Sequence, residues 1–332
     1  MKDRKSGHLN KAQGLLLALG KITEIHVVEF PIAWRVPGLR QLLSYLGKKS
    51  FKCPIHWVLK NVPSMSGIDL IVSAGGLTQW PNAALAYQFH KSNVFLGSPR
   101  KMNPDLFTLI GMHDAPRNQP PYYHFDIIPS LVSPESAEQA ANEAGLPLHR
   151  DWGILMGGDG EGIAWKEDDY LEMTEKFLTQ AKDSGNQVRI ATSRRTPVHV
   201  EVKLREMVTK SGLLAGACWY HSREQSAPSL LAMLGACSRL AVTADSMSMT
   251  HEAVSSGRPV FVIRPEVGGN PRLMGNIDEL ATAGYLLPQN IKSLDMIGST
   301  PENGWRLIAR DPSLALAEAV IASLPKSVFG SI

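Results

Sequence analysis

The residues best suited to chemistry lie in residues 240–252, where a short apolar run that predicts a buried strand precedes hydroxyl and carboxylate side chains. Asp245, Ser246 and Ser248 are of the types that cap helix N-termini, so we expect a helix to begin there. The unpaired N–H groups and dipole of such a helix favour an anion such as a diphosphate. Glu252, about one turn further on, could accept hydrogen bonds from the two hydroxyls of a ribose. An ordinary strand followed by a capped helix would show the same local pattern.

Two more loops at predicted strand ends carry residue types that bind phosphates. The strand at 153–156 ends in a glycine-rich turn that lets a backbone approach a phosphate closely, and its residues are Gly157, Gly158, Asp159 and Gly160. The strand at 188–191 ends in hydroxyls and two guanidinium groups that suit bidentate phosphate contacts, and the key residues are Ser193, Arg194 and Arg195. A solvated turn is the alternative for this second loop. Because the carboxyl ends of parallel strands share one edge, we expect both loops near residues 245–252.

The first half of the chain offers a sparser set. A polar cluster around His8 opens a helix pattern that runs to Gly20, and such a turn ordinarily follows a strand, so a leading strand is expected to be missing or shortened. Gly75 and Gly76 follow a predicted strand at 68–73 and form its ligand-facing turn. An imidazole titrates near neutrality, so His8 is a candidate general base, with a turn histidine bonded to backbone as the equal alternative.

Strands that alternate with helices predict an α/β fold with parallel sheets and helices on both faces. The predicted strands of the first half are 22–30, 68–73, 93–96, 106–110 and 125–128, and those of the second half are 153–156, 188–191, 217–220, 240–243 and 260–263. We expect helices at 82–90, 133–144, 273–283 and 304–324. The expected domains are residues 1–146 and 147–332, and the last helix is a candidate to pack back on the first domain.

The composition, 44% hydrophobic and 20% charged with a net charge of +3, is that of a globular protein. No apolar run reaches the roughly 18 residues that span a bilayer. Cys53, Cys218 and Cys237 show neither metal-ligand nor disulfide spacing, so we expect a reducing cytoplasm and no metal site.

The charge is unevenly distributed, because between Phe30 and Pro104 Asp69 is the only acid. The segment 34–52 combines leucines at helical spacing with aromatic residues and five bases, namely Arg35, Arg40, Lys48, Lys49 and Lys52. Such a segment is typical of attachment to an anionic membrane, here the inner face, although leucines at this spacing more often face a core. No nucleic-acid-binding motif accompanies the charge, so we expect no nucleic acid.

Five motifs occur in an order that resembles the mitochondrial fission "elongated mitochondria" family. They are Ser6-Gly7-His8-Leu9-Asn10, Ser73-Ala74-Gly75-Gly76, Gly157-Gly158-Asp159-Gly160, Thr192-Ser193-Arg194-Arg195-Thr196 and Asp245-Ser246-Met247-Ser248-Met249 with Glu252. The family's leading strand and its Asp-Gly preface to the Gly-His turn are absent or altered here, with Asp3 the nearest acid. That family is in turn similar to GT-B glycosyltransferases and to the sugar-nucleotide epimerase on the same fold. The resemblance implies two Rossmann-like domains with a ligand cleft between them.

The resemblance also implies roles for individual residues. Glu252 would hold the ribose, and Asp245, Ser246, Ser248 and Met249 would surround the diphosphate. Ser193, Arg194 and Arg195 would neutralise the leaving diphosphate in place of a metal ion. The co-substrate would be a nucleoside-diphosphate sugar, with no further cofactor.

Three functions therefore compete. The first is a metal-independent glycosyltransferase acting on a glycan or lipid-linked acceptor. The second is an epimerase of nucleoside-diphosphate sugars, for which no acid and base pair stands out in the sequence. The third is a non-enzymatic adaptor at a membrane surface, which would have no need of Arg194, Arg195 and Glu252 at converging strand ends.

Overall fold

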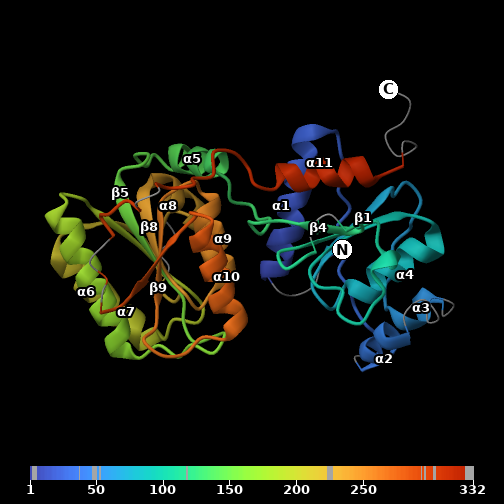
Figure 1. Ribbon diagram of the computed structural model, residues 1–332, viewed down its shortest axis with the longest axis horizontal. Helices are drawn as coiled ribbons and strands as arrows, with labels where there is room; N and C mark the ends of the chain where they lie inside the picture. Colours follow the sequence, from blue (N-terminus) through green and yellow to red (C-terminus); the bar gives the residue numbers. More distant parts are fainter. Residues whose placement is uncertain are drawn as a thin grey trace. The chain divides into compact units, whose positions relative to one another are not determined.

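A computed structural model describes residues 1, 6–36, 38–46, 51, 54–116, 119–222, 227–292, 294, 297–301 and 304–325 of the 332-residue chain. The chain forms two compact units, Met1–Leu131 with Pro312–Ile332, and Val132–Asp311 (Figure 1). The structure thus divides the chain earlier than the expected boundary after residue 146, and the C-terminal segment belongs with the first unit.

The first unit contains one parallel sheet with the order β1-β2-β3-β4. Its strands are β1 (Leu70–Ala74), β2 (Ser92–Leu96), β3 (Leu109–Met112) and β4 (Tyr122–His124). Its helices are α1 (Ser6–Ile22), α2 (Leu39–Leu46), α3 (Ile55–Val58), α4 (Gln79–Phe89), the 3-10 turn η2 (Pro104–Leu106) and α11 (Leu314–Ser323). The core contains Trp80 of α4, Phe95 of β2 and Ile110 of β3, each at most 1% exposed. Helix α4 therefore packs against the sheet.

Three predictions of strands and helices were wrong. The predicted strand 22–30 is not formed, since Ile22 ends α1, residues 24–30 have no strand assignment, and β1 pairs with β2 alone in the described part of the chain. Residues 125–128 are not a strand, since the Phe125 carbonyl bonds the imidazole of His113 instead of continuing the ladder. Residues 304–313 are not helical in the described part, and the last helix begins only after Pro312.

The second unit contains a six-stranded parallel sheet with the order β10-β9-β8-β5-β6-β7. Its strands are β5 (Asp151–Met156), β6 (Val188–Thr192), β7 (Leu214–Cys218), β8 (Cys237–Thr243), β9 (Val260–Arg264) and β10 (Leu287–Asn290). Its helices are α5 (Pro134–Glu143), α6 (Glu167–Asp183), α7 (Val198–Ser211), α8 (Leu230–Ala236), α9 (Met247–Ser255) and α10 (Pro271–Thr282). Helices α6 and α7 cover one face of the sheet, and α9 and α10 cover the other (Figure 1).

The strand order reverses between β5 and β8, the two central strands. The chain proceeds outward through β6 and β7 on one side and through β9 and β10 on the other. Such a reversal opens a crevice outside the carboxyl ends of the two strands, where open α/β sheets bind their ligands. Every residue of β5 is buried, and so are the last four of β8, as their apolar sequences predict.

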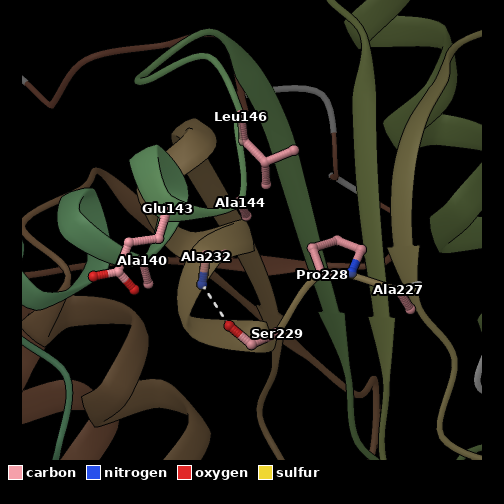
Figure 2. A pocket seen from close by; sticks show the side chains of 8 residues that line it. All are labelled: Ala140, Glu143, Ala144, Leu146, Ala227, Pro228, Ser229 and Ala232. Atoms are coloured by element: carbon pink, nitrogen blue, oxygen red, sulfur yellow. Dashed lines mark hydrogen bonds between the residues drawn. The ribbon is translucent and has the colours of Figure 1, made fainter. Parts of the chain in front are cut away.

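Helix α5 joins the second unit because it packs closely on α8. A side chain at Gly235 of α8 would overlap the carbonyl of Ala137 in α5, so the two helices touch through backbone. Beside them lies a surface hollow of about 470 Å³ (Figure 2). Its two polar side chains both make hydrogen bonds within the protein. Ser229 caps α8 by accepting from the Ala232 N–H at 3.1 Å, and Glu143 accepts from Gln139 at 2.8 Å. The hollow contains none of the predicted ligand residues.

Candidate functional site

Three loops meet at the carboxyl ends of β5, β6 and β8, as the sequence predicted. The Arg195 guanidinium, in the loop after β6, pairs with the Asp245 carboxylate after β8 at 2.6 Å. It also donates to the carbonyls of Asp245 at 3.3 Å and Asp159 at 3.4 Å. The Gly157 N–H donates to the hydroxyl of Thr243 at 2.7 Å. Hydrogen bonds therefore join all three loops at the point where the strand order reverses.

The glycines of the turn after β5 are required by neighbouring loops. A side chain at Gly157 would overlap the Asp245 carboxylate, and one at Gly158 would overlap the backbone of Arg195. One at Gly160 would overlap the Arg195 guanidinium. Close packing of the neighbouring loops thus explains why these positions are glycine, without any ligand. The sequence alone could not reveal these contacts.

Asp245 is fully buried and accepts three hydrogen bonds. The donors are the Gly158 N–H at 3.0 Å, the Trp165 indole N–H at 2.9 Å and Arg195. Sequence analysis placed Asp245 among the residues around the diphosphate, whereas the structure turns its carboxylate toward the other loops. Trp165, which the sequence analysis missed, is itself buried and fixes the second carboxylate oxygen.

A second layer of hydroxyls lies beneath the loops. Thr196 donates to the carbonyl of Gly157 at 2.6 Å and accepts from the Ser193 N–H at 3.0 Å. The Tyr170 hydroxyl also reaches the Gly157 carbonyl, at 3.4 Å. Burial, reinforced by the nearby Asp245 carboxylate, raises the pKa of Tyr170 well above its usual value, so Tyr170 stays a neutral donor. These hydrogen bonds hold the loop after β6 against the turn after β5.

Helix α9 begins at the centre of this site. Of the three candidate caps, Ser246 is the N-cap, and its hydroxyl accepts from the Met249 N–H at 3.4 Å. Ser248 is exposed in the first turn, and Met249 and Glu252 are partly buried further along the helix. The structure thus places the predicted ribose and diphosphate residues on one helix start at the strand ends.

The two arginines have different surroundings. Arg195 has 31% of its side chain exposed and directs its donors at Asp245 and Asp159. Arg194 is exposed. Ser193 accepts from the Arg195 N–H at 3.2 Å, so its hydroxyl helps to shape the turn. Arg195 is therefore the arginine that supports the loops.

Glu201, on α7, was also missed by the sequence analysis. Its fully buried carboxylate accepts from the backbone N–H groups of Tyr220, His221 and Ser222 at 2.8–3.1 Å. Burial alone would raise the pKa of this carboxyl, but the hydrogen bonds from Thr192, His221 and Ser222 favour the ionised form and leave the pKa below its ordinary value. Glu201 therefore ties the segment after β7 to the strand end of β6.

In the first unit, His8 lies against the turn after β1. A side chain at Gly75 would overlap the His8 imidazole, and Gly75 has a φ of +87°, which favours glycine. Gly76, next to it, is partly buried. The structure thus brings His8 and the Gly75-Gly76 turn together. Asp3, the nearest acid in the sequence, lies outside the described residues.

The segment 34–52 does not behave as a simple core stripe. Leu43 is buried, but Leu42 is 55% exposed and Tyr45 is 74% exposed. Arg35 donates to the carbonyls of His56 and Leu59 at 2.9 and 3.1 Å. The other four bases, Arg40, Lys48, Lys49 and Lys52, and also Cys53, lie outside the described side chains.

None of the helices that the structure describes has the length and hydrophobicity needed to cross a bilayer. Nor does the described part of the chain group three or more His, Cys, Asp or Glu side chains as metal ligands would be.

Solved structures share the fold over nearly the whole chain. A UDP-GlcNAc 2-epimerase from Methanocaldococcus jannaschii has a TM-score of 0.55 at 10% identity, covering 96% of this chain and 98% of that one. The kitacinnamycin glycotransferase has a TM-score of 0.54 at 12% identity, with 97% of each chain covered. The expected α/β fold with two Rossmann-like domains of the GT-B type is confirmed.

Sequence comparison identifies the family. A search of curated proteins found no match to this chain. The profile described as mitochondrial fission ELM1 matches residues 6–322, which is nearly the entire length and includes all five motifs. The chain belongs to the mitochondrial fission ELM1 family.

Proposed function

We propose that the chain is a glycosyltransferase that moves a sugar from a nucleoside-diphosphate donor to a hydroxyl acceptor. The observation that carries this proposal is the convergence of three hydrogen-bonded loops on the start of α9, where the strand order reverses. A helix start at strand ends favours a diphosphate, and the loop after β6 carries the exposed guanidinium of Arg194.

The donor would lie on the second unit. Its diphosphate would sit at the first turn of α9, where the Ser248 hydroxyl is exposed. Glu252, one turn further, would accept from the ribose hydroxyls. Fold neighbours support this choice in a general way, since one is a glycotransferase and another is a UDP-GlcNAc 2-epimerase.

Charge on the leaving diphosphate would be neutralised by Arg194. Arg195 directs its guanidinium at Asp245, so its role would be to hold the loops in place. A fixed cation can stabilise developing charge as a bound metal would, so the transfer would need no divalent metal. His8, beside Gly75 at the carboxyl end of β1, would remove the proton from the acceptor hydroxyl.

The acceptor would be a glycan or a lipid-linked sugar reached at the cytoplasmic membrane face. The exposed Leu42, Tyr45 and Leu46 in the basic segment 34–52 support this placement. Sedimentation with anionic and neutral vesicles tests it. We expect binding to anionic vesicles alone, weakened by salt, and equal binding to neutral vesicles would contradict it.

A second candidate is epimerisation of the nucleotide sugar. The fold is shared with the UDP-GlcNAc 2-epimerase (TM-score 0.55) as much as with the glycotransferase (0.54), so this reaction is kept as the alternative. The two reactions differ in their products, since a transferase releases a nucleoside diphosphate only when an acceptor is present, and an epimerase converts the donor alone.

A panel of UDP, GDP, ADP and dTDP sugars, screened by thermal shift, tests the binding. A bound donor at about 100 times its Kd adds ~2.7 kcal/mol of stability. The donor that stabilises is then incubated with and without chelator, and product is measured by mass. We expect activity to survive chelator and to fall in Arg194→Ala. A panel without any stabilising nucleotide would contradict the proposal, and loss of activity with chelator would reverse the metal-independent step.

A further inference from the structure

The loop after β5 contains a hairpin with a two-residue turn. Gly160 and Ile163 exchange both backbone hydrogen bonds at 2.9 Å, and the residues between them, Glu161 and Gly162, have φ values of +51° and +78°. Positive φ at both central positions is the geometry of a type I′ turn, which ordinarily takes asparagine, aspartate or glycine. Glu161 therefore holds an uncommon backbone conformation, and such a residue persists only where its surroundings fix it.

The surroundings that fix Glu161 belong to the loop after β9. The Gly269 N–H donates to the Gly162 carbonyl at 2.9 Å, and the Asn270 N–H donates to the Glu161 carbonyl at 2.7 Å. The Asn270 amide group also donates to the Glu161 carboxylate. Asn270 is itself held, because its side-chain oxygen caps α10 by accepting from the Leu273 N–H at 2.8 Å. We call the two joined segments, residues 160–163 and 268–270, the strap.

The strap spans the carboxyl end of β8. In the second sheet β8 lies between β9 and β5, so the hydrogen bonds between the loops after β9 and β5 bridge the end of β8. The loop after β5 also contacts the residues that lead into α9, since the Trp165 indole donates to the Asp245 carboxylate at 2.9 Å. Helix α9 follows directly, with Ser246 as its N-cap. The strap therefore lies next to the helix start at which we place the donor diphosphate.

The inference that follows rests on the proposed function, which places the ribose at Glu252, one turn along α9. A diphosphate at the helix start then carries its sugar on the side away from the ribose, beyond the end of the helix. The strap lies there, and the Glu161 side chain on it is exposed. Arg194 follows β6, on the other side of β5 from β8, so this cation and Glu161 lie on opposite sides of β5.

We propose that Glu161 selects the sugar of the donor by charge, so that neutral sugars are bound and sugars with a carboxylate, such as uronic acids, are rejected. A carboxylate accepts hydrogen bonds from sugar hydroxyls but donates none, so it can bind a hydroxymethyl group and repels a second carboxylate. Because Asn270 holds the Glu161 carboxylate, the repulsive group has a fixed position. A group that opposes the wrong ligand is a common source of specificity.

Calorimetric titration of the full chain with UDP-glucose and UDP-glucuronate tests this selection, because the two donors differ only at C6. If another nucleotide of the panel binds instead of UDP, the glucose and glucuronate derivatives of that nucleotide replace the pair. The unmodified chain should bind the glucuronate about tenfold more weakly or worse than the glucose derivative. The difference should shrink in ~1 M salt, because salt screens exposed charges.

A matched pair of variants assigns the selection to Glu161. Glu161→Gln keeps the size of the side chain and an acceptor for Asn270 but removes the charge, so the two donors should bind within about threefold of each other. Glu175→Gln, an exposed change on α6, should keep the preference of the unmodified chain.

Two results would overturn the role of Glu161 and leave the nucleotide site standing. They are equal binding of both donors by the unmodified chain, and a preference that persists in Glu161→Gln. Binding of no nucleotide of the panel would instead contradict the proposed function, and the selection by Glu161 with it.

Discussion

The carboxyl edges of the two sheets are built differently. At the second sheet a fully buried carboxylate, Asp245, binds a backbone amide, an indole and a guanidinium from two other loops. At the first sheet His8 rests on Gly75 by close contact, and a cavity runs along the neighbouring edge strand β1. The second unit thus joins its strand-end loops by hydrogen bonds, while in the first unit the described contact at the strand end is one of close packing.

The largest expected effect is the loss of Asp245. Asp245→Ala would remove the acceptor of three hydrogen-bond donors, Gly158, Trp165 and Arg195, and would break the ion pair with Arg195. It should lower the free energy of unfolding by about 3 kcal/mol. That is the lower end of the range for a broken buried pair, because Arg195 keeps 31% of its side chain exposed. Urea denaturation measures it, with Asp168→Ala, an exposed acid of α6, as control. A loss equal to that of the control would contradict the network.

Features that depend on residues close together in the sequence could be predicted, and features that depend on distant residues were missed. Strands β5 and β8 and their loops were predictable, because apolar runs and capping residues are local signals. Asp245 was placed correctly but misinterpreted, because its partners Trp165 and Gly158 are 80 and 87 residues away in sequence. Residues 22–30 have the sequence of a strand, but a strand also needs a neighbour, and β1 does not pair with them.

The stability that Glu201 contributes to the second unit should depend on pH. Its lowered pKa means that its stabilising contribution is present at pH values above its ordinary pKa near 4.5 and is lost as the pH falls through the folded value. Glu201→Gln turns an amide group toward backbone N–H donors and should cost about 2 kcal/mol at pH 7. The gap between wild type and variant should close in acid.

Unfolding free energies measured from pH 7 to pH 3 test this expectation. Glu206→Gln, an exposed change on the same helix, is the matched control and should show little effect at any pH. A wild-type advantage that persists unchanged at pH 3 would show that the ionised carboxylate is not the cause.

The first unit offers a smaller, cleanly matched test. Gly67 and Gly75 both have positive φ, +73° and +87°, but a side chain at Gly67 meets nothing within 4 Å and one at Gly75 meets His8. Gly67→Ala should cost about 1 kcal/mol for the backbone conformation. Gly75→Ala should cost about 1–2 kcal/mol more, because His8 must move. Equal thermal denaturation curves for the two variants would contradict a close contact between Gly75 and His8.

Calorimetric titration of UDP, GDP, ADP and dTDP tests most directly whether α9 presents a nucleoside-diphosphate site. At least one should bind the wild type, and Glu252→Ala should weaken that binding by roughly tenfold to over a hundredfold, the effect of about 1.5–3 kcal/mol from a lost charged hydrogen-bond partner. Glu175→Ala, an exposed glutamate of α6, should bind as the wild type does. Unchanged affinity in Glu252→Ala, or binding by none of the four nucleotides, would contradict the claim.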